Sequence, residues 1–291
     1  MENGFALHKC TIKIGGGKKM KYILFYLVIF LTLNSCSFQL NQKNVVRIVG
    51  SDTMFELTSL LAEEFMKEHS NISIYIKGGG TAEGIKSLIK NECEICSASR
   101  NLKPDEAKEL AEYYGSLGLV FLIAKDALSI YLNKDNNVKC LTSSQLKNIY
   151  KGEIKNWKEL GGADTLISVV TRNPNSGTYL YFKDHILEGE NYMSDAIIKS
   201  TTKDVVKFVA ENVNAIGYGG MSYAQNIIHS TIDGVEPNEI NVRNDTYPIT
   251  RYLHFFTTKT PGGAEKKFID WVLSPKGQRI VRKAGFIPLW E

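Results

Sequence analysis

Short apolar segments alternate along most of the chain with longer segments whose apolar residues recur at helical spacing. Residues 45–49 form the first apolar run, which predicts a strand. Residues 54–69 follow, with apolar positions every three or four residues, which predicts a helix. Repeated strand–helix alternation is typical of α/β folds built on parallel sheets.

The same periodicity predicts elements up to the end of the sequence. Further strands are expected over residues 72–76, 95–99, 127–133, 167–171, 215–218 and 252–257. Further helices are expected over residues 81–90, 143–150, 179–187 and 205–212, with one long amphipathic helix over 261–284. A chain of 291 residues is long enough for one large or two modest domains.

The most continuous apolar run, residues 22–33, lies near the N-terminus and follows Lys18, Lys19 and Lys21. It is shorter than the ~20 residues that span a bilayer, and it matches the apolar region of an export signal. We therefore expect residues 1–35 to be a signal peptide. Met20 would be an ordinary start for such a signal, and we expect it to be the true start.

The sequence Leu33-Asn34-Ser35-Cys36 at the end of this run resembles a bacterial lipobox. The resemblance implies cleavage before Cys36, lipidation of its thiol and acylation of the new amine. Several acyl chains would hold the protein at a membrane, with residues 36–44 as a tether. The alternative is a plain secretory signal in which Cys36 occurs by chance.

Charge is concentrated in the same N-terminal segment. The chain has 35 basic and 31 acidic residues, a formal net charge of +4. Five of those basic residues and one acidic residue precede Cys36, so the rest of the chain has equal numbers of basic and acidic residues. Without a basic domain or stripe, nucleic acid is not an expected partner.

Three cysteines follow the leader region: Cys93, Cys96 and Cys140. Cys93 and Cys96 have the CxxC spacing of a redox or metal pair, but no second CxxC accompanies them. The simpler interpretation places them in or beside a small-residue strand, and their pairing stays open. We expect no metal and no cofactor.

Three segments share one design, in which a strand is followed by Gly, Ser or Thr and then by a helix. They are 50–53 (GSDT), 79–82 (GGTA) and 176–178 (SGT). Glycine allows close backbone approach, hydroxyls donate hydrogen bonds, and a helix start adds N–H groups and a positive dipole end. Together with Arg100 and Arg172 they predict an oxyanion site. Neither a P-loop nor a GxGxxG fingerprint is present, so a nucleotide is not expected.

Over residues 45–290 the chain resembles the phosphate-binding proteins of bacterial phosphate ABC transporters. The segments that carry the resemblance are GSDTM (50–54), GGGTAEGIKSL (78–88), SASR (97–100), AKDALSIYLN (124–133), LTSSQLKNIYKGEIKNWKELGG (141–162), TRNPNSGT (171–178), AIGYGGMSYA (215–224) and WVLSPKGQRIVRKAGFIPL (271–289). The resemblance implies a two-lobed α/β fold of the periplasmic-binding-protein type (type II), each lobe a mixed, mostly parallel sheet flanked by helices.

The resemblance also implies the residues that hold phosphate. The first phosphate-binding helix start of these proteins corresponds to Thr53 and the backbone N–H of Met54, with Ser51 nearby. The second corresponds to Thr81. The third supplies Arg172 for charge-assisted bonds, together with Ser176, Gly177 and Thr178.

One departure concerns how phosphate is distinguished from sulfate. Some members have Asp at the position of Arg100, where it accepts the proton of phosphate. Arg100 cannot accept, although we expect it to contact the anion. Two roles remain open for Asp52: replacing that acceptor, or capping the following helix.

The resemblance predicts that residues 45–121 and 250–291 form lobe 1 and residues 122–249 form lobe 2. It implies a monomeric, extracytoplasmic protein, anchored through Cys36, that binds inorganic phosphate and delivers it to the permease subunits of an ABC transporter. Enzymatic activity is not expected, because no His or Cys nucleophile adjoins the anion segments and the sequence shows no carboxylate/His metal cluster. The alternatives are another oxyanion, sulfate or molybdate, and a phosphate sensor or adhesin on the same fold.

Overall fold

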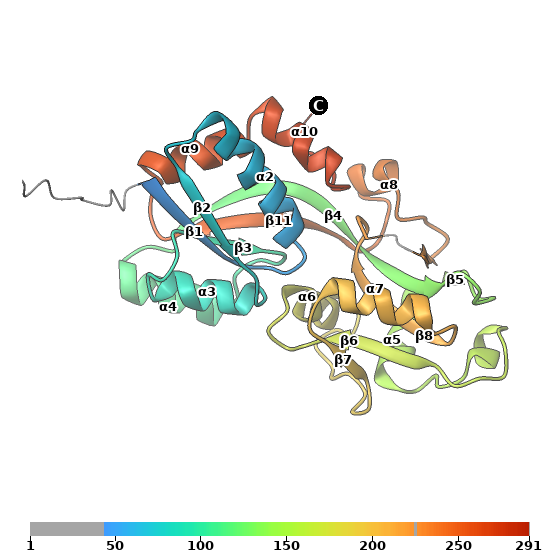
Figure 1. Cartoon of the computed structure of the whole chain (residues 1–291). Helices are drawn as coiled ribbons and strands as arrows, with labels where there is room; N and C mark the ends of the chain where they lie inside the picture. Colours follow the sequence, from blue (N-terminus) through green and yellow to red (C-terminus); the bar gives the residue numbers. More distant parts are fainter. Residues whose placement is uncertain (1–43, 224–225, 291) are drawn as a thin grey trace, which may run out of the picture. The chain divides into compact units, whose positions relative to one another are not determined.

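The computed structural model describes residues 44–223 and 226–290, and within them helices flank a mixed sheet (Figure 1). This confirms the predicted fold class. The predicted signal peptide, the Met20 start and the lipidated Cys36 lie outside the described residues. Within the described ranges, no helix has the length and apolar character needed to cross a membrane.

The element bounds follow the predicted alternation. The strands are β1 (Val45–Gly50), β2 (Ser73–Lys77), β3 (Ile95–Ala98), β4 (Leu119–Asn133), β5 (Cys140–Leu141), β6 (Ser168–Arg172), β7 (Ile197–Lys199), β8 (Ala215–Gly220), β9 (Ile227–His229), β10 (Thr231–Ile232) and β11 (Thr250–Thr257). The helices are α2 (Phe55–Glu68), α3 (Thr81–Ile89), α4 (Pro104–Tyr114), α5 (Ser143–Lys151), the 3-10 helix η2 (Trp157–Leu160), α6 (Gly177–His185), α7 (Thr202–Glu211), α8 (Glu239–Arg243), α9 (Gly263–Val272) and α10 (Pro275–Lys283).

The main sheet has the strand order β2-β1-β3-β11-β4-β8-β6-β7, with β9 paired to β4. Pairing is parallel at both ends, where β1 pairs with β2 and β3, and β6 pairs with β7 and β8. It is antiparallel in the middle, where β11 and β8 pair with different parts of the long strand β4. The strand β4 therefore connects the two parallel regions.

Two hydrophobic clusters cover opposite faces of the first region. Val46 and Ile48 of β1 pack in a cluster with residues of α2, α9 and α10, whereas Val49 packs in a cluster with residues of α3 and α4. The change of face follows from the alternation of side chains along a strand. Figure 1 shows α9 and α10 beside α2, and α3 beside α4.

The second region is built in the same way. Leu128, Ile130 and Leu132 of β4 face a cluster that includes side chains of α5 and α6, while Tyr131 faces the cluster of α7. The residues of the two clusters in the first region lie either before residue 125 or from Leu253 onward. Nearly all residues of the other two clusters lie between these points.

Two expectations about elements need correction, and some elements were not expected. The expected strand 127–133 begins at Leu119, because β4 pairs with β11 before it pairs with β8. The helices α4 and α8, the 3-10 helix η2 and the strands β5, β7, β9 and β10 were not expected. The single long helix expected over 261–284 is wrong, because this segment forms two helices, α9 and α10. The second helix begins at Pro275, and the Ser274 hydroxyl caps it by accepting a hydrogen bond from the Gly277 N–H (3.4 Å).

Candidate functional site

The starts of α2, α3 and α6 each follow the carboxyl end of a strand, β1, β2 and β6 respectively. Ligands of open α/β sheets bind outside the carboxyl ends of the strands. Two of these starts are in direct contact: the Ala82 N–H donates to the Asn175 carbonyl (3.2 Å). A Cβ atom at Gly177 would lie 2.3 Å from Thr81 Oγ1, so glycine is required for this approach.

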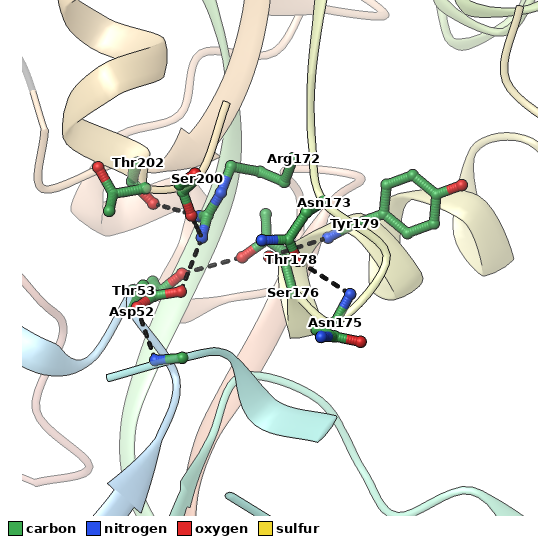
Figure 2. Close-up of polar contacts among 12 residues, drawn as sticks. Asp52, Thr53, Arg172, Asn173, Asn175, Ser176, Thr178, Tyr179, Ser200 and Thr202 are labelled. Atoms are coloured by element: carbon green, nitrogen blue, oxygen red, sulfur yellow. Dashed lines mark hydrogen bonds and ion pairs between the residues drawn. The ribbon is translucent and has the colours of Figure 1, made fainter. Parts of the chain in front are cut away.

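The start of α2 reaches the start of α6 through two hydroxyls. Thr53 Oγ1 lies 2.9 Å from Thr178 Oγ1, and both side chains are buried (Figure 2). A third hydroxyl, that of Thr81, is buried too and accepts a hydrogen bond from the backbone N–H of Ser99 (3.2 Å). Thr53, Thr81 and Thr178 thus come together from three segments that are far apart in the sequence.

Arg172 ends β6 and is almost fully buried, with 1% of its side chain exposed. Its Nη1 donates to Thr202 Oγ1 (2.8 Å), and its Nη2 donates to the Ser200 carbonyl (2.8 Å) and to Asp52 Oδ2 (3.0 Å) (Figure 2). Burial lowers the pKa of the guanidinium, and the Asp52 carboxylate opposes that shift. Nε has no hydrogen-bond partner among the described residues, which leaves one buried charge-assisted donor.

Asp52 connects two parts of the site. Its Oδ1 accepts from the Gly79 backbone N–H (3.0 Å) before α3, and its Oδ2 accepts from Arg172. The helix-cap role considered for Asp52 is wrong, because α2 has its N-cap at Met54 and no side chain caps it. The carboxylate instead links Gly79 to Arg172 across the site.

The other predicted residues of the first and third segments lie in the same loops. Ser51 is buried after β1, and the Met54 N–H donates to the Ser51 carbonyl (3.1 Å). Ser176 is the N-cap of α6, and its Oγ accepts from the Tyr179 N–H (3.4 Å; Figure 2). Gly177 is the first residue of α6, two residues before the expected start of this helix.

Arg100 has other partners. Its guanidinium forms two hydrogen bonds with the Glu106 carboxylate (2.6 and 2.7 Å) and one with the Asn101 carbonyl (2.8 Å). Across residues 44–223 and 226–290, none of its hydrogen bonds reaches the hydroxyls of the three helix starts. The adjacent Ser99 lies there instead, because its Oγ would be 2.6 Å from a Cβ at Gly177.

Three residues beside the site were not among the predicted site residues: Ser99, Asp126 and Arg251. Arg251 of β11 is buried and donates from Nη1 to Thr178 Oγ1 (3.0 Å). Its Nε and Nη2 donate to Asp126 Oδ2 of β4 (3.0 and 2.8 Å). The one signal available was a charged residue directly before each of two predicted strands, which does not reveal that β11 and β4 are neighbours.

The CxxC cysteines do not belong to this site. Cys93 and Cys96 are both free and buried, and burial raises the pKa of the Cys93 thiol to about 12. Reactive thiols have lowered pKa values, so the interpretation as a structural pair is favoured. In the described part of the chain, no group of three or more His, Cys, Asp or Glu side chains could hold a metal ion.

Comparisons with known proteins show which family the chain belongs to. The model of the PBP superfamily domain matches residues 39–276. The chain is 32% identical to the phosphate-binding protein PstS of Pseudomonas aeruginosa, covering 83% of this chain and 82% of the relative. It is 33% identical to PstS of Bacillus subtilis, covering 84% and 80%.

Solved structures extend the similarity to three dimensions. A putative phosphate ABC transporter substrate-binding protein from Clostridium perfringens, solved with bound phosphate, has a TM-score of 0.79 and 35% identity. The match covers 85% of this chain and all of that one. PstS from Borrelia burgdorferi has a TM-score of 0.59 and 26% identity, with 85% of this chain covered and all of that one. The chain therefore belongs to the PBP superfamily and, within it, to the PstS family of phosphate-binding proteins.

Proposed function

We propose that the chain is an extracytoplasmic binding protein that captures inorganic phosphate and delivers it to the permease of an ABC transporter. The observation that carries this proposal is the meeting of three helix starts beside the buried Arg172. Hydroxyls, backbone N–H groups and a guanidinium are all donors, which suits a dehydrated oxyanion. Members of this family bind and transport their ligand, so we assign no enzymatic activity.

The phosphate would be held by residues of the three segments. The proposed ligands are the hydroxyls of Thr53, Thr81, Ser176 and Thr178, the backbone around Gly177, and Arg172. Asp52 would accept the proton of the bound anion. Arg100 is the weakest member of the predicted set, because Glu106 and the Asn101 carbonyl already engage its guanidinium.

The direct test is calorimetric titration of the anion-stripped protein, from residue 37 onward, with phosphate, sulfate and molybdate. We expect tight phosphate binding, weaker binding of the other two anions, and a phosphate-dependent rise in melting temperature. A ligand at 100 times its dissociation constant stabilises the folded state by about 2.7 kcal/mol. Preferential binding of sulfate or molybdate would replace phosphate with that anion, and binding of none would contradict the proposal.

We further propose that Cys36 carries a lipid that anchors the protein to a membrane, facing the periplasm or the exterior, as a monomer. The support is the sequence around Cys36, which lies outside the described residues. Cys36→Ala should move the protein from the membrane fraction to the soluble fraction after cell lysis. If the variant stays in the membrane fraction, Cys36 is not the anchor.

A further inference from the structure

A buried ion pair lies directly behind the hydroxyls of the proposed phosphate site. The Arg251 and Asp126 side chains have 1% and 0% of their surface exposed. They come from the antiparallel strands β11 and β4, in which Arg251 and Asp126 are register partners. An ion pair this deep adds little net stability in most proteins, so its position beside the site points to another role.

The pair fixes the Arg251 guanidinium in one orientation. Nε and Nη2 both donate to Asp126 Oδ2, while the Met221 backbone N–H donates to Asp126 Oδ1 (3.3 Å). Burial raises the pKa of Asp126, and the Arg251 charge opposes that shift. The remaining terminal nitrogen, Nη1, is therefore held against Thr178 Oγ1.

This contact restricts the Thr178 hydroxyl. A guanidinium can only donate, so Thr178 Oγ1 must accept from Arg251, and its own proton must point elsewhere. Thr53 Oγ1 lies 2.9 Å away on another side of Thr178. If Thr178 donates to Thr53, the Thr53 proton must in turn point away from Thr178. If Thr53 instead donates to Thr178, the Thr178 proton is the free one, so in either case one proton of the pair is available to an anion.

The other site hydroxyls are set in the same way by neutral donors. Thr81 Oγ1 accepts from the Ser99 N–H, and Ser176 Oγ accepts from the Tyr179 N–H. Arg251 differs because its donor is charged and buried, and charge-assisted hydrogen bonds are about twice as strong as neutral ones. The positive charge also lies only one hydroxyl away from the proposed anion.

We propose that Arg251, held by Asp126, is a positioning residue that makes the Thr178–Thr53 hydroxyl pair present one proton to the bound oxyanion. The assignment rests on the proposed function, since it concerns the same site. Arg251 acts through the Thr178 hydroxyl. Removing that hydroxyl should therefore remove most of the effect of Arg251 on anion affinity.

A double-mutant cycle tests this coupling. Arg251→Gln combined with Asp126→Asn removes both charges without leaving one buried and unpaired. We expect phosphate affinity, measured by calorimetry, to fall roughly 10- to 100-fold in the otherwise natural protein. In a Thr178→Val background, the same two changes should lower affinity less than about threefold. Arg47→Gln with Glu94→Gln, an exposed ion pair of the same sheet, is the control and should leave affinity unchanged.

The outcomes separate the two proposals. If the wild-type chain binds phosphate and the losses are additive, Arg251 is only structural and the positioning role is overturned. If the wild-type chain binds no oxyanion, the proposed function fails and the positioning role fails with it. Should the neutral pair not fold, Arg251→Lys replaces it in the cycle. A single ammonium cannot maintain all three bonds to Asp126 and Thr178, so the same non-additivity is expected.

Discussion

At the scale of single residues, Arg172 and Asp52 define the charge balance that an anion would meet at the proposed site. Arg172 donates to Thr202 and to the Ser200 carbonyl within the same proposed lobe, so these bonds hold the guanidinium in place before any ligand arrives. Such preorganisation lowers the entropic cost of binding. Asp52 brings the opposite charge to the site, and this suits an anion that carries a proton better than one that does not.

The acceptor role proposed for Asp52 gives a prediction about selectivity. Phosphate at neutral pH keeps a proton that a carboxylate can accept, whereas sulfate has none. Asp52→Ala should lower the ratio of phosphate affinity to sulfate affinity by about tenfold or more, measured by calorimetry. The matched control is Glu56→Ala in α2, whose carboxylate pairs with Lys203. If Asp52→Ala leaves the ratio of phosphate affinity to sulfate affinity unchanged, Asp52 does not distinguish the two anions.

His254 of β11 gives a prediction about pH. Burial lowers its pKa to about 4 from an ordinary value of 6.5, so the folded protein keeps it neutral. Between these values the unfolded chain binds more protons than the folded one, and stability falls as pH falls, by on the order of 2–3 kcal/mol in all. We expect His254→Gln to lose less stability than wild type between pH 6.5 and pH 4 in denaturant titrations.

The same substitution at an exposed histidine is the control for this experiment. His185→Gln, near the end of α6, should leave the pH dependence of stability as it is in wild type. Identical pH profiles for wild type and His254→Gln would show that another group causes the acid sensitivity.

At the scale of elements, the proposed site depends on the short distance between the starts of α3 and α6. The sequence pattern predicted both helices, but it placed the start of α6 at residue 179. The structure begins α6 at Gly177, because Ser176 caps the helix and Gly177 lies against Thr81 and Ser99. Composition alone cannot show that a glycine is required by contact with a distant segment.

Gly177→Ala tests that contact. The added methyl would lie within 2.3–2.9 Å of Thr81 and Ser99 atoms, so the two helix starts must separate. We expect phosphate affinity to fall at least tenfold, since a misplacement of this size disturbs aligned hydrogen bonds. Gly262→Ala is the control, because a Cβ there meets no atom within 4 Å. Equal affinities for the two variants would mean that this contact does not support the site.

At the scale of the whole molecule, we propose the lobe boundaries that the sequence suggested, 45–121 with 250–291 and 122–249. The division of the hydrophobic clusters near residues 124–127 and 249–253 supports them. Several contacts cross the proposed boundary, including Thr53 with Thr178, Asp52 with Arg172, and Glu56 with Lys203. These contacts would be made as the lobes close on an anion.

Closure predicts a change in size that small-angle X-ray scattering can measure. Adding phosphate to the anion-stripped protein should lower the radius of gyration, because the bound anion stabilises the closed arrangement by its differential affinity. Arg172→Ala is the control, since it should neither bind phosphate tightly nor respond to it. Superimposable curves for the wild-type protein with and without phosphate would contradict the proposed movement.

The sequence by itself determined the α/β class, most strands and helices, and the three helix starts with Arg172. These features depend on local periodicity, glycine and hydroxyl residues, which a single segment displays. The tertiary structure alone decided that Arg100 pairs with Glu106, that Asp52 bridges Gly79 and Arg172, and that Arg251 reaches Thr178. The reason is that such partnerships join residues from separate elements. They are set by sheet order and register, which no local pattern records.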